Sequence, residues 1–269
     1  MPVADFDDTR TRHAEQLTAA VREAGKLALG KFRAPLKSWN KAGDSPVSET
    51  DIAVNEFLQE RLRDPSGKIG WLSEETEDDP ERMKACRVWI IDPIDGTRAY
   101  IGGLPDWSIA TALVEDGRPI VAVLFAPVED EMFVAVAGRG ATLNGVTIRP
   151  KDGNDLDGAR IAGPPGYLRR LQAIEPRYAP QPKIHSLALR FARVAHGAID
   201  AAFASANSHD WDLAAADLLV HEAGGALTTF TGQRLTYNKA EPVHPPLVAA
   251  GLQRHAILTA LVQEHPISR

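Results

Sequence analysis

Two stretches near the N-terminus repeat apolar residues at the spacing of one face of an α-helix. The first, residues 11–32, carries them at Leu17, Val21, Ala24, Leu27 and Ala28. The second, residues 48–63, carries them at Ile52, Val54, Phe57, Leu58 and Leu62. Such a repeat predicts an amphipathic helix with one buried face. Asp51 falls in the first turn of the second helix, at the positive end of the helix dipole.

The middle of the chain has the composition of β-strands instead. Residues 108–114, 120–125 and 131–137 are the clearest of these segments. The Asp-Gly pair at 116–117 and the Asn-Gly pair at 144–145 are typical of tight hairpin turns. Together these signals predict an antiparallel sheet.

After about residue 155, strand and helix patterns alternate. Strands are expected at 159–162 and 198–204, and helices at 187–195 and from Asp212 to a stop at the paired glycines 224–225. This alternation predicts a second sheet with helices, so the fold class is mixed, α+β in one part and α/β in the other.

Composition fits one folded unit without extreme features. The chain has 269 residues, 44% of them hydrophobic, enough for one large core or two joined ones. We expect a single catalytic unit over residues 1–269, with halves at approximately 1–150 and 151–269. A formal net charge of −6 argues against binding to nucleic acid polymers.

Location and targeting are also constrained by composition. The single cysteine, Cys86, cannot form an internal disulfide, which favours a reducing cytoplasm. The acidic N-terminus lacks the pattern of a signal peptide, and no apolar run is long enough to span a membrane. We therefore expect a cytoplasmic protein with no membrane partner.

The most informative stretch is residues 88–97, in which four apolar residues are followed by Asp92, Pro93, Ile94, Asp95, Gly96 and Thr97. An apolar run that ends in Pro and Gly predicts a buried strand leading into a tight turn. Two carboxylates this close repel each other unless a cation or a shared proton relieves them, and Mg²⁺ prefers oxygen ligands. Backbone N–H groups at a helix start suit a phosphate. The simpler interpretation is a turn without chemistry.

Two further acidic patches favour the chemical interpretation. Glu74 and Glu75 follow a short apolar strand at 69–72, as Asp92 follows its own strand. Asp212 lies directly after Trp211 at the start of a predicted helix, where the simplest role for an aspartate is an N-cap.

These patches together resemble the inositol monophosphatase superfamily of Mg²⁺-dependent, lithium-sensitive phosphatases. The matching pieces are Trp-Leu-Ser-Glu-Glu (71–75), Asp-Pro-Ile-Asp-Gly-Thr (92–97), Trp-Asp-Leu-Ala-Ala (211–215) and the segment from Lys41 through Asp44 to Asp51. The resemblance covers about residues 10 to 250. It implies a layered αβαβα sandwich with the metal site between the two halves, two or three Mg²⁺ per site, and commonly a homodimer.

The resemblance also implies residue roles. Metal ligands would be Glu74, Asp92, the carbonyl of Ile94, Asp95 and Asp212. The catalytic groups would be Asp51, Thr97 and Glu74, with the Asp51–Thr97 pair deprotonating a water. Substrate contacts would come from Asp95, Gly96, Thr97 and Ser205. Three further residues would contact the metal ligands without binding metal themselves: Glu75, Lys41 and Trp211.

A second phosphatase class presents similar residues. Haloacid-dehalogenase-type enzymes also place aspartates after an apolar strand, but they need an Asp-x-Asp spacing. Here Asp92 and Asp95 are spaced Asp-x-x-Asp, and they lie a third of the way along the chain. We therefore disfavour that class.

The substrate is less constrained. Inositol-specific members generally carry a glutamate seven residues before the metal-binding aspartate, where this chain has Ser205. The sequences of residues 44–48 and 117–121 look more like those of the 3′(2′),5′-bisphosphate nucleotidase branch. Enzymes of this branch remove the 3′-phosphate of adenosine 3′,5′-bisphosphate. That small phosphorylated metabolite is the first choice, and an inositol or histidinol monophosphatase is the alternative. A non-catalytic metal-dependent sensor of phosphometabolites is the hypothesis from another class.

Two further groups have no assigned role. The basic pair Arg169-Arg170 and Lys183 could contact a second phosphate, although such residues are more often solvated. The histidines, including His185 and His209, lack metal-ligand spacing, and isolated histidines are more often surface or packing residues.

Overall fold

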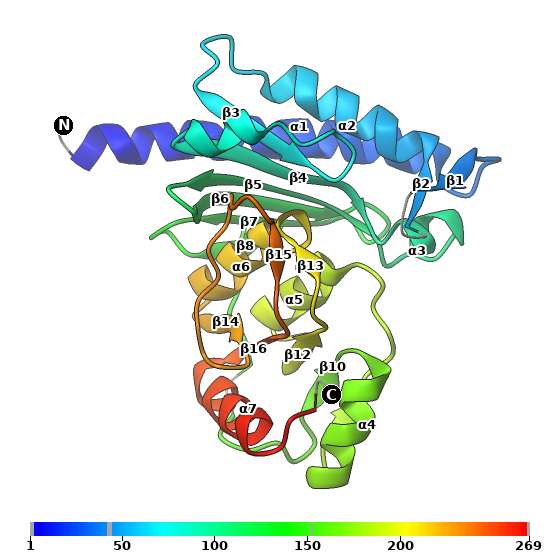
Figure 1. Ribbon diagram of the computed structural model, residues 1–269, viewed down its shortest axis with the longest axis vertical. Coiled ribbons are helices and arrows are strands. Elements are labelled where there is room, and N and C mark those ends of the chain that lie inside the picture. The colour runs from blue at the N-terminus through cyan, green and yellow to red at the C-terminus, as the bar shows by residue number, and fades with distance from the viewer. Residues whose placement is uncertain (1–2, 42–44, 152, 268–269) are drawn as a thin grey trace.

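The computed structural model describes residues 3–41, 45–151 and 153–267, and it stacks helices and sheets in alternating layers (Figure 1). Asp44, within one of the motif segments, lies outside the described residues. The helices are α1 (Val3–Lys31), α2 (Glu49–Leu62), α3 (Thr97–Ile101), α4 (Pro165–Ile174), α5 (Leu187–Ala195), α6 (Asp210–Glu222) and α7 (Leu252–Glu264), with a 3₁₀ turn at Pro80–Lys84.

The larger sheet has seven strands in the order β3-β4-β5-β6-β7-β8-β9. Only the β3–β4 pair is parallel. Both predicted hairpin turns are present, since Asp116, Gly117, Asn144 and Gly145 all have positive φ as this turn type requires. The strands are β3 (Ile69–Ser73), β4 (Arg87–Asp95), β5 (Ser108–Glu115), β6 (Arg118–Ala126), β7 (Glu131–Val136), β8 (Ala141–Leu143) and β9 (Val146–Thr147).

The smaller sheet has five strands in the order β11-β10-β12-β16-β14 and mixes parallel and antiparallel pairs. Two further strand pairs, β1–β2 and β13–β15, are short. The bounds are β1 (Ser38–Asn40), β2 (Pro46–Ser48), β10 (Arg160–Ala162), β11 (Ala179–Pro180), β12 (Ala201–Ala204), β13 (Ser208–His209), β14 (Gly225–Thr229), β15 (Val243–His244) and β16 (Leu247–Gly251).

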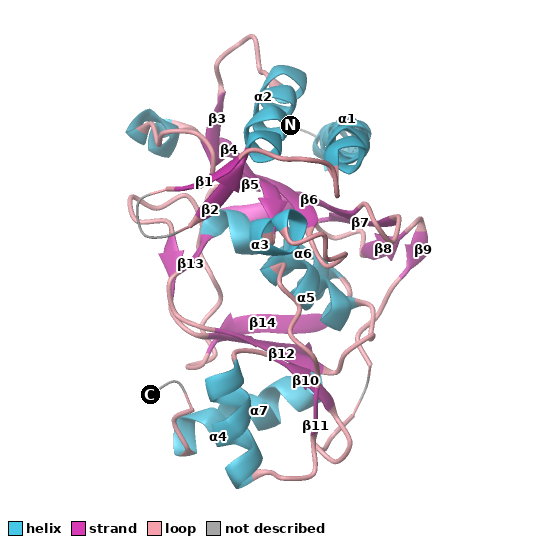
Figure 2. Ribbon diagram, turned by 90° about the vertical axis from the view of Figure 1, so that its right-hand side faces the viewer, coloured by secondary structure: helices cyan, strands magenta, loops and turns pink. Residues whose placement is uncertain are grey.

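The layer order is helix, sheet, helix, sheet, helix (Figures 1 and 2). Helices α1 and α2 cover one face of the larger sheet, α5 and α6 lie between the two sheets, and α4 and α7 cover the far face of the smaller sheet. This arrangement confirms the expected αβαβα sandwich.

The predicted helical faces are mostly buried, with Leu27, Ile52 and Phe57 only partly covered. In α1, Leu17, Val21, Ala24 and Ala28 are fully buried in a cluster that also contains residues of β4, β5 and β6. The helix begins at Val3, earlier than residue 11, and α6 begins at Asp210 rather than Asp212. Both differences are of the size expected for helix ends.

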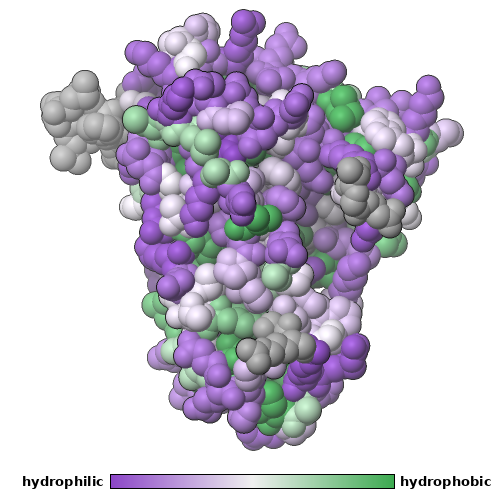
Figure 3. Space-filling view, viewed as in Figure 1, coloured by the Kyte–Doolittle hydropathy of each residue, from purple (hydrophilic) through white to green (hydrophobic). Residues whose placement is uncertain are grey.

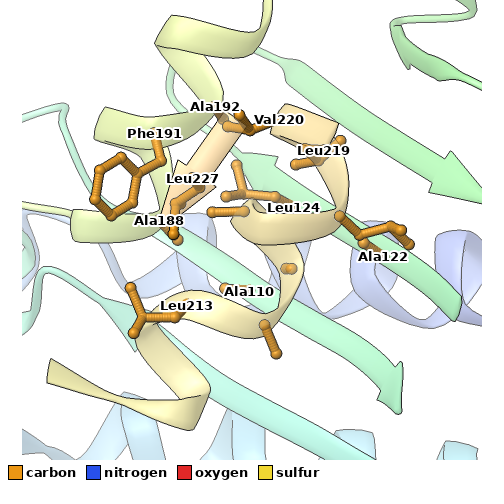
Figure 4. Close-up of a cluster of buried hydrophobic side chains, with 14 of the residues drawn as sticks. Ala110, Ala122, Leu124, Ala188, Phe191, Ala192, Leu213, Leu219, Val220 and Leu227 are labelled. Atoms are coloured by element: carbon orange, nitrogen blue, oxygen red, sulfur yellow. The ribbon is translucent and has the colours of Figure 1, made fainter. Parts of the chain in front are cut away.

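The layer between the sheets has a core of small side chains. Ala188 and Ala192 of α5 face Leu213, Leu219 and Val220 of α6, and both helices pack on Ala110, Ala122 and Leu124 of the larger sheet (Figure 4). Small residues allow the helices to approach each other and the sheet closely. The packing of α5 and α6 therefore positions the start of α6, where Asp212 lies.

The face seen in Figure 3 is largely hydrophilic, with hydrophobic residues in small separate groups. Over the described residues, no helix is both long and apolar enough to cross a membrane.

Candidate active site

The end of β4 sets the geometry of the site. Asp92 pairs with Ala110 of β5, whereas Asp95 pairs with Ser108, so β4 accommodates one extra residue between them. Pro93 cannot donate a backbone hydrogen bond to the sheet, which favours a bulge at this point. The Asp92 side chain stabilises the turn because its Oδ1 accepts from the backbone N–H of Ile94 at 3.0 Å.

Three carboxylates converge at this turn. Oxygen atoms of Asp92, Asp95 and Asp212 lie within 4.8 Å of one another, and all three residues are poorly exposed. Asp212 comes from the start of α6, where its Oδ2 accepts from the backbone N–H of His209 at 2.7 Å. The same aspartate therefore caps the helix and belongs to the cluster, so the N-cap and metal-ligand interpretations are compatible.

Asp95 is held in place by the start of α5. Its Oδ2 accepts from the Ser186 hydroxyl at 2.5 Å and from the Ala188 N–H at 2.6 Å. Its Oδ1 accepts from the Leu187 N–H at 3.1 Å. These donors fix the carboxylate orientation before any ligand arrives. No local sequence pattern predicts these contacts, because they join positions 91 to 93 residues apart.

The second acidic patch lies beside the cluster. Glu74 lines the same cavity as the three aspartates. Glu75 is nearly fully buried and forms an ion pair with the Lys41 ammonium at 2.5 Å, while the same ammonium donates to the Glu74 carbonyl at 3.1 Å. Lys41 thus positions this turn by pairing with Glu75 and leaves the Glu74 carboxylate facing the aspartates.

Thr97 and Asp51 form a buried pair. The Thr97 hydroxyl lies 3.0 Å from Asp51 Oδ1 and 3.0 Å from the Ile94 carbonyl, and its one proton can be donated to either. Asp51 also accepts from the Ser48 N–H at 2.9 Å and from the Ser48 hydroxyl, in a capping box at the start of α2. Gly96, with φ of +92°, makes the turn that places Thr97 at the start of α3.

Burial and mutual repulsion raise the pKa values of the acidic cluster. Burial first, and then the charge of Asp212, raise the pKa of Glu74 to about 8. Burial first, and then Asp95, raise the pKa of Asp212 to about 7. Burial followed by the charge of Glu74 raises the pKa of Asp92 well above its usual range. Burial also raises the pKa of Asp95, against the lowering effect of the Ser186 hydrogen bond. Such a cluster is costly to ionise without a cation.

A cavity of about 360 Å³ opens over these groups. Its lining residues are Ser45, Pro46, Glu74, Asp92, Asp95, Gly96, Thr97, Arg98, Lys183, His185 and Asp212.

Other predicted site residues lie outside this lining. Asp51 is absent from the lining but accepts a hydrogen bond from Thr97, which does line the cavity. Trp211 packs partly against the central core and stacks on His209, with ring centroids 4.5 Å apart. Ser205 is exposed and is absent from the lining, so its proposed contact with substrate stays a prediction.

The model of the inositol monophosphatase family matches residues 10–266. The chain belongs to this family. Nus factor SuhB of Escherichia coli K12 is 33% identical over 224 residues, which are 79% of this chain and 83% of the relative. Inositol monophosphatase of Dictyostelium discoideum is 34% identical over 239 residues, 83% of this chain and 87% of the relative.

Solved structures of the inositol monophosphatase type share the fold. The extragenic suppressor protein suhB of Bartonella henselae superposes with a TM-score of 0.83 at 26% identity, covering 93% of this chain and 98% of that one. An IMPase of Thermotoga maritima gives 0.83 at 27% identity, covering 94% and 97%. Family membership makes this chain a phosphoric monoester hydrolase, while none of these four relatives is named as a bisphosphate nucleotidase.

Proposed function

We propose that the protein is a Mg²⁺-dependent phosphomonoester hydrolase that uses water as the nucleophile. The observation that carries this proposal is the convergence of Asp92, Asp95 and Asp212 within 4.8 Å beside the buried Thr97–Asp51 pair. The three aspartate carboxylates, the Glu74 carboxylate and the Ile94 carbonyl would together offer the hard oxygen donors that Mg²⁺ prefers. The raised pKa values of Glu74 and Asp212 indicate that the cluster needs a cation to be fully ionised at neutral pH.

The chain's own residues would supply binding and proton transfer. Bound Mg²⁺ contributes Lewis-acid activation of water and charge compensation for the phosphate. The Thr97 hydroxyl would accept a proton from the attacking water as its own proton passes to Asp51 Oδ1. Burial raises the pKa of Asp51, which makes this carboxylate a better proton acceptor. Gly96 and Thr97 line the cavity at the start of α3, where their amides would hold the phosphate.

Two classes of phosphomonoester are candidate substrates. The names of the relatives favour an inositol monophosphate, which is the alternative drawn from the sequence. A bisphosphate such as adenosine 3′,5′-bisphosphate is favoured by the cationic residue Lys183 in the cavity wall. We prefer the bisphosphate because the Lys183 ammonium could pair with a second phosphate, whereas the inositol ring carries only uncharged hydroxyl groups.

The test is phosphate release from a panel, with Mg²⁺ and with a chelator. The panel contains adenosine 3′,5′-bisphosphate, inositol 1-phosphate, histidinol phosphate and fructose 1,6-bisphosphate. Turnover that requires Mg²⁺ supports the proposal, and the highest kcat/KM identifies the class of substrate. Tight Mg²⁺ binding without turnover on any phosphomonoester would instead support the sensor hypothesis.

A further inference from the structure

The cavity has a cationic side as well as an acidic one. Lys183 and His185 belong to the segment just before α5, and both line the cavity. The carboxylates proposed to bind metal come from other parts of the chain, chiefly β4 and the start of α6. Over residues 3–41, 45–151 and 153–267, no carboxylate lies within ion-pair distance of the exposed Lys183 ammonium. A cation that lines a phosphate-binding cavity without a protein partner is available to an anionic ligand.

His185 is fixed by Asp106. Asp106 Oδ2 accepts from the backbone N–H of His185 at 2.7 Å and lies 2.7 Å from its ring Nδ1. The carboxylate therefore fixes both the backbone and the ring, with side-chain exposures of 24% for His185 and 21% for Asp106. The opposite ring nitrogen, Nε2, has no hydrogen-bond partner among the described residues, so it is available to a ligand in the cavity.

The Asp106–His185 pair lies directly against the turn at Gly96. A Cβ atom added to Gly96 would lie 3.1 Å from the Ser186 nitrogen and 3.3 Å from the Asp106 carbonyl oxygen. The Asp106 carbonyl also accepts from the Ser186 N–H at 3.1 Å. The cationic segment is thus adjacent to the expected phosphate position, and its own placement depends on the same turn.

We propose that Lys183 and His185 form a subsite for a second anionic group of the substrate, with Asp106 as the residue that positions His185. This inference rests on the proposed phosphatase function and assigns its specificity. In the liganded state, Asp106 would hold the ring through Nδ1 and leave Nε2 directed to the anion. Lys183 would add a charge-assisted hydrogen bond to the same group.

The charge distribution explains why the second group would bind there. Any Mg²⁺ held by Asp92, Asp95 and Asp212 compensates the phosphate that is cleaved. A second phosphate or carboxylate near those aspartates would meet repulsion, whereas Lys183 and His185 offer donors. The subsite therefore selects phosphomonoesters that carry a second anion over esters of neutral alcohols.

The experiment uses matched substrate pairs that differ in the second anion alone. Adenosine 3′,5′-bisphosphate is compared with adenosine 3′-monophosphate, and 3-phosphoglycerate with glycerol 1-phosphate. The measured quantity is the ratio of kcat/KM within each pair. Selection in the first pair alone identifies a phosphate subsite, and selection in the second pair also shows that a carboxylate is accepted.

Variants then assign the ratio to residues. Lys183→Ala and His185→Gln should each lower the ratio by about tenfold, as expected for loss of a charge-assisted contact. In both variants, we expect kcat/KM on adenosine 3′,5′-bisphosphate to fall more than kcat/KM on adenosine 3′-monophosphate. Lys183→Arg should retain the preference, and Asp106→Asn should lower it. Lys26→Ala, an exposed lysine of α1, is the control for loss of one charge.

The outcomes separate the inference from the function on which it rests. Equal wild-type kcat/KM within both pairs overturns the subsite while leaving the phosphatase intact. Equal losses on both members of a pair in the variants also overturn it, because Lys183 and His185 would then serve the cleaved phosphate. Failure of the wild-type protein to hydrolyse any phosphomonoester would overturn the proposed function itself.

Discussion

The Thr97 hydroxyl lies 3.0 Å from Asp51 Oδ1, although 46 residues separate the two in the chain. Asp51 is fixed by the capping box at the start of α2, and Thr97 is fixed by the turn at the start of α3. The pair is therefore formed by two helix starts that converge on one point.

Removing either member of this pair should slow turnover with little effect on metal binding. Thr97→Val and Asp51→Asn should each lower kcat by roughly 10²- to 10⁴-fold, the usual contribution of general-base catalysis. Thr97→Ser keeps the hydroxyl and serves as the matched control. The measurement is kcat under saturating Mg²⁺, with Mg²⁺ affinity determined by calorimetry. Full activity in Thr97→Val would contradict the proposed proton path.

Asp92→Asn should weaken Mg²⁺ binding and lower activity together. Asp92 lies in the acidic cluster, where burial first, and then the charges of Glu74, Asp95 and Asp212, raise its pKa. We expect kcat to fall by about three orders of magnitude, the size of several kcal/mol of charge stabilisation. Calorimetric titration with Mg²⁺ checks the binding. Asp116→Asn, in an exposed hairpin turn outside the cavity, is the control. Normal Mg²⁺ affinity in Asp92→Asn would exclude this carboxylate as a ligand.

The stability of the metal-free protein should fall as pH rises from about 5 to about 8. The pKa of Asp212 is raised from 3.8 to about 7, and that of Glu74 from 4.5 to about 8. In this window the folded state therefore binds more protons than the unfolded state, so the free energy of unfolding decreases with pH. Thermal unfolding in a chelator measures it.

Two comparisons isolate the contribution of the acidic cluster to that pH dependence. Asp212→Asn should flatten the slope relative to the wild-type protein, because one raised carboxyl is gone. Saturating Mg²⁺ should do the same, because the cation favours the ionised carboxylates. A wild-type slope identical to that of Asp212→Asn would show that the cluster does not contribute.

Lithium should inhibit the enzyme at roughly tens of millimolar. The cluster of Asp95 and Asp212 offers hard oxygen donors to a small cation, and the family resemblance places the second metal there. The test is an inhibition curve with LiCl against KCl at equal ionic strength. Equal activity in the two salts would count against a second metal site of this kind.

The sequence predicted elements whose signal is local. Residues 11–32 and 48–63 had a clear apolar face, and they correspond to α1 and α2. Asp116-Gly117 and Asn144-Gly145 needed positive φ, and both form the expected turns. The acidic motifs were equally local, since each follows an apolar run, and Asp92, Asp95 and Asp212 do converge.

What the sequence did not reveal depends on tertiary contacts. Helix α4 begins at Pro165-Gly166, which resembles a loop, and α7 packs only Arg254, Leu258 and Val262 into the core, a weak repeat. The role of the 183–188 segment was likewise hidden, because its link to Asp95 spans more than 90 residues. In the sequence His185 looks like an isolated histidine for the same reason, because its partner, Asp106, is 79 residues away.

The three donors that hold Asp95 have a consequence for how this protein tolerates change. A single carboxylate joins the end of a strand in one sheet to the helix that separates the two sheets. Any replacement of Asp95 removes hydrogen bonds between two layers of the fold as well as an oxygen ligand for the metal. A substitution at Asp95 would therefore reduce the amount of folded protein, and this loss would hide any separate effect on turnover.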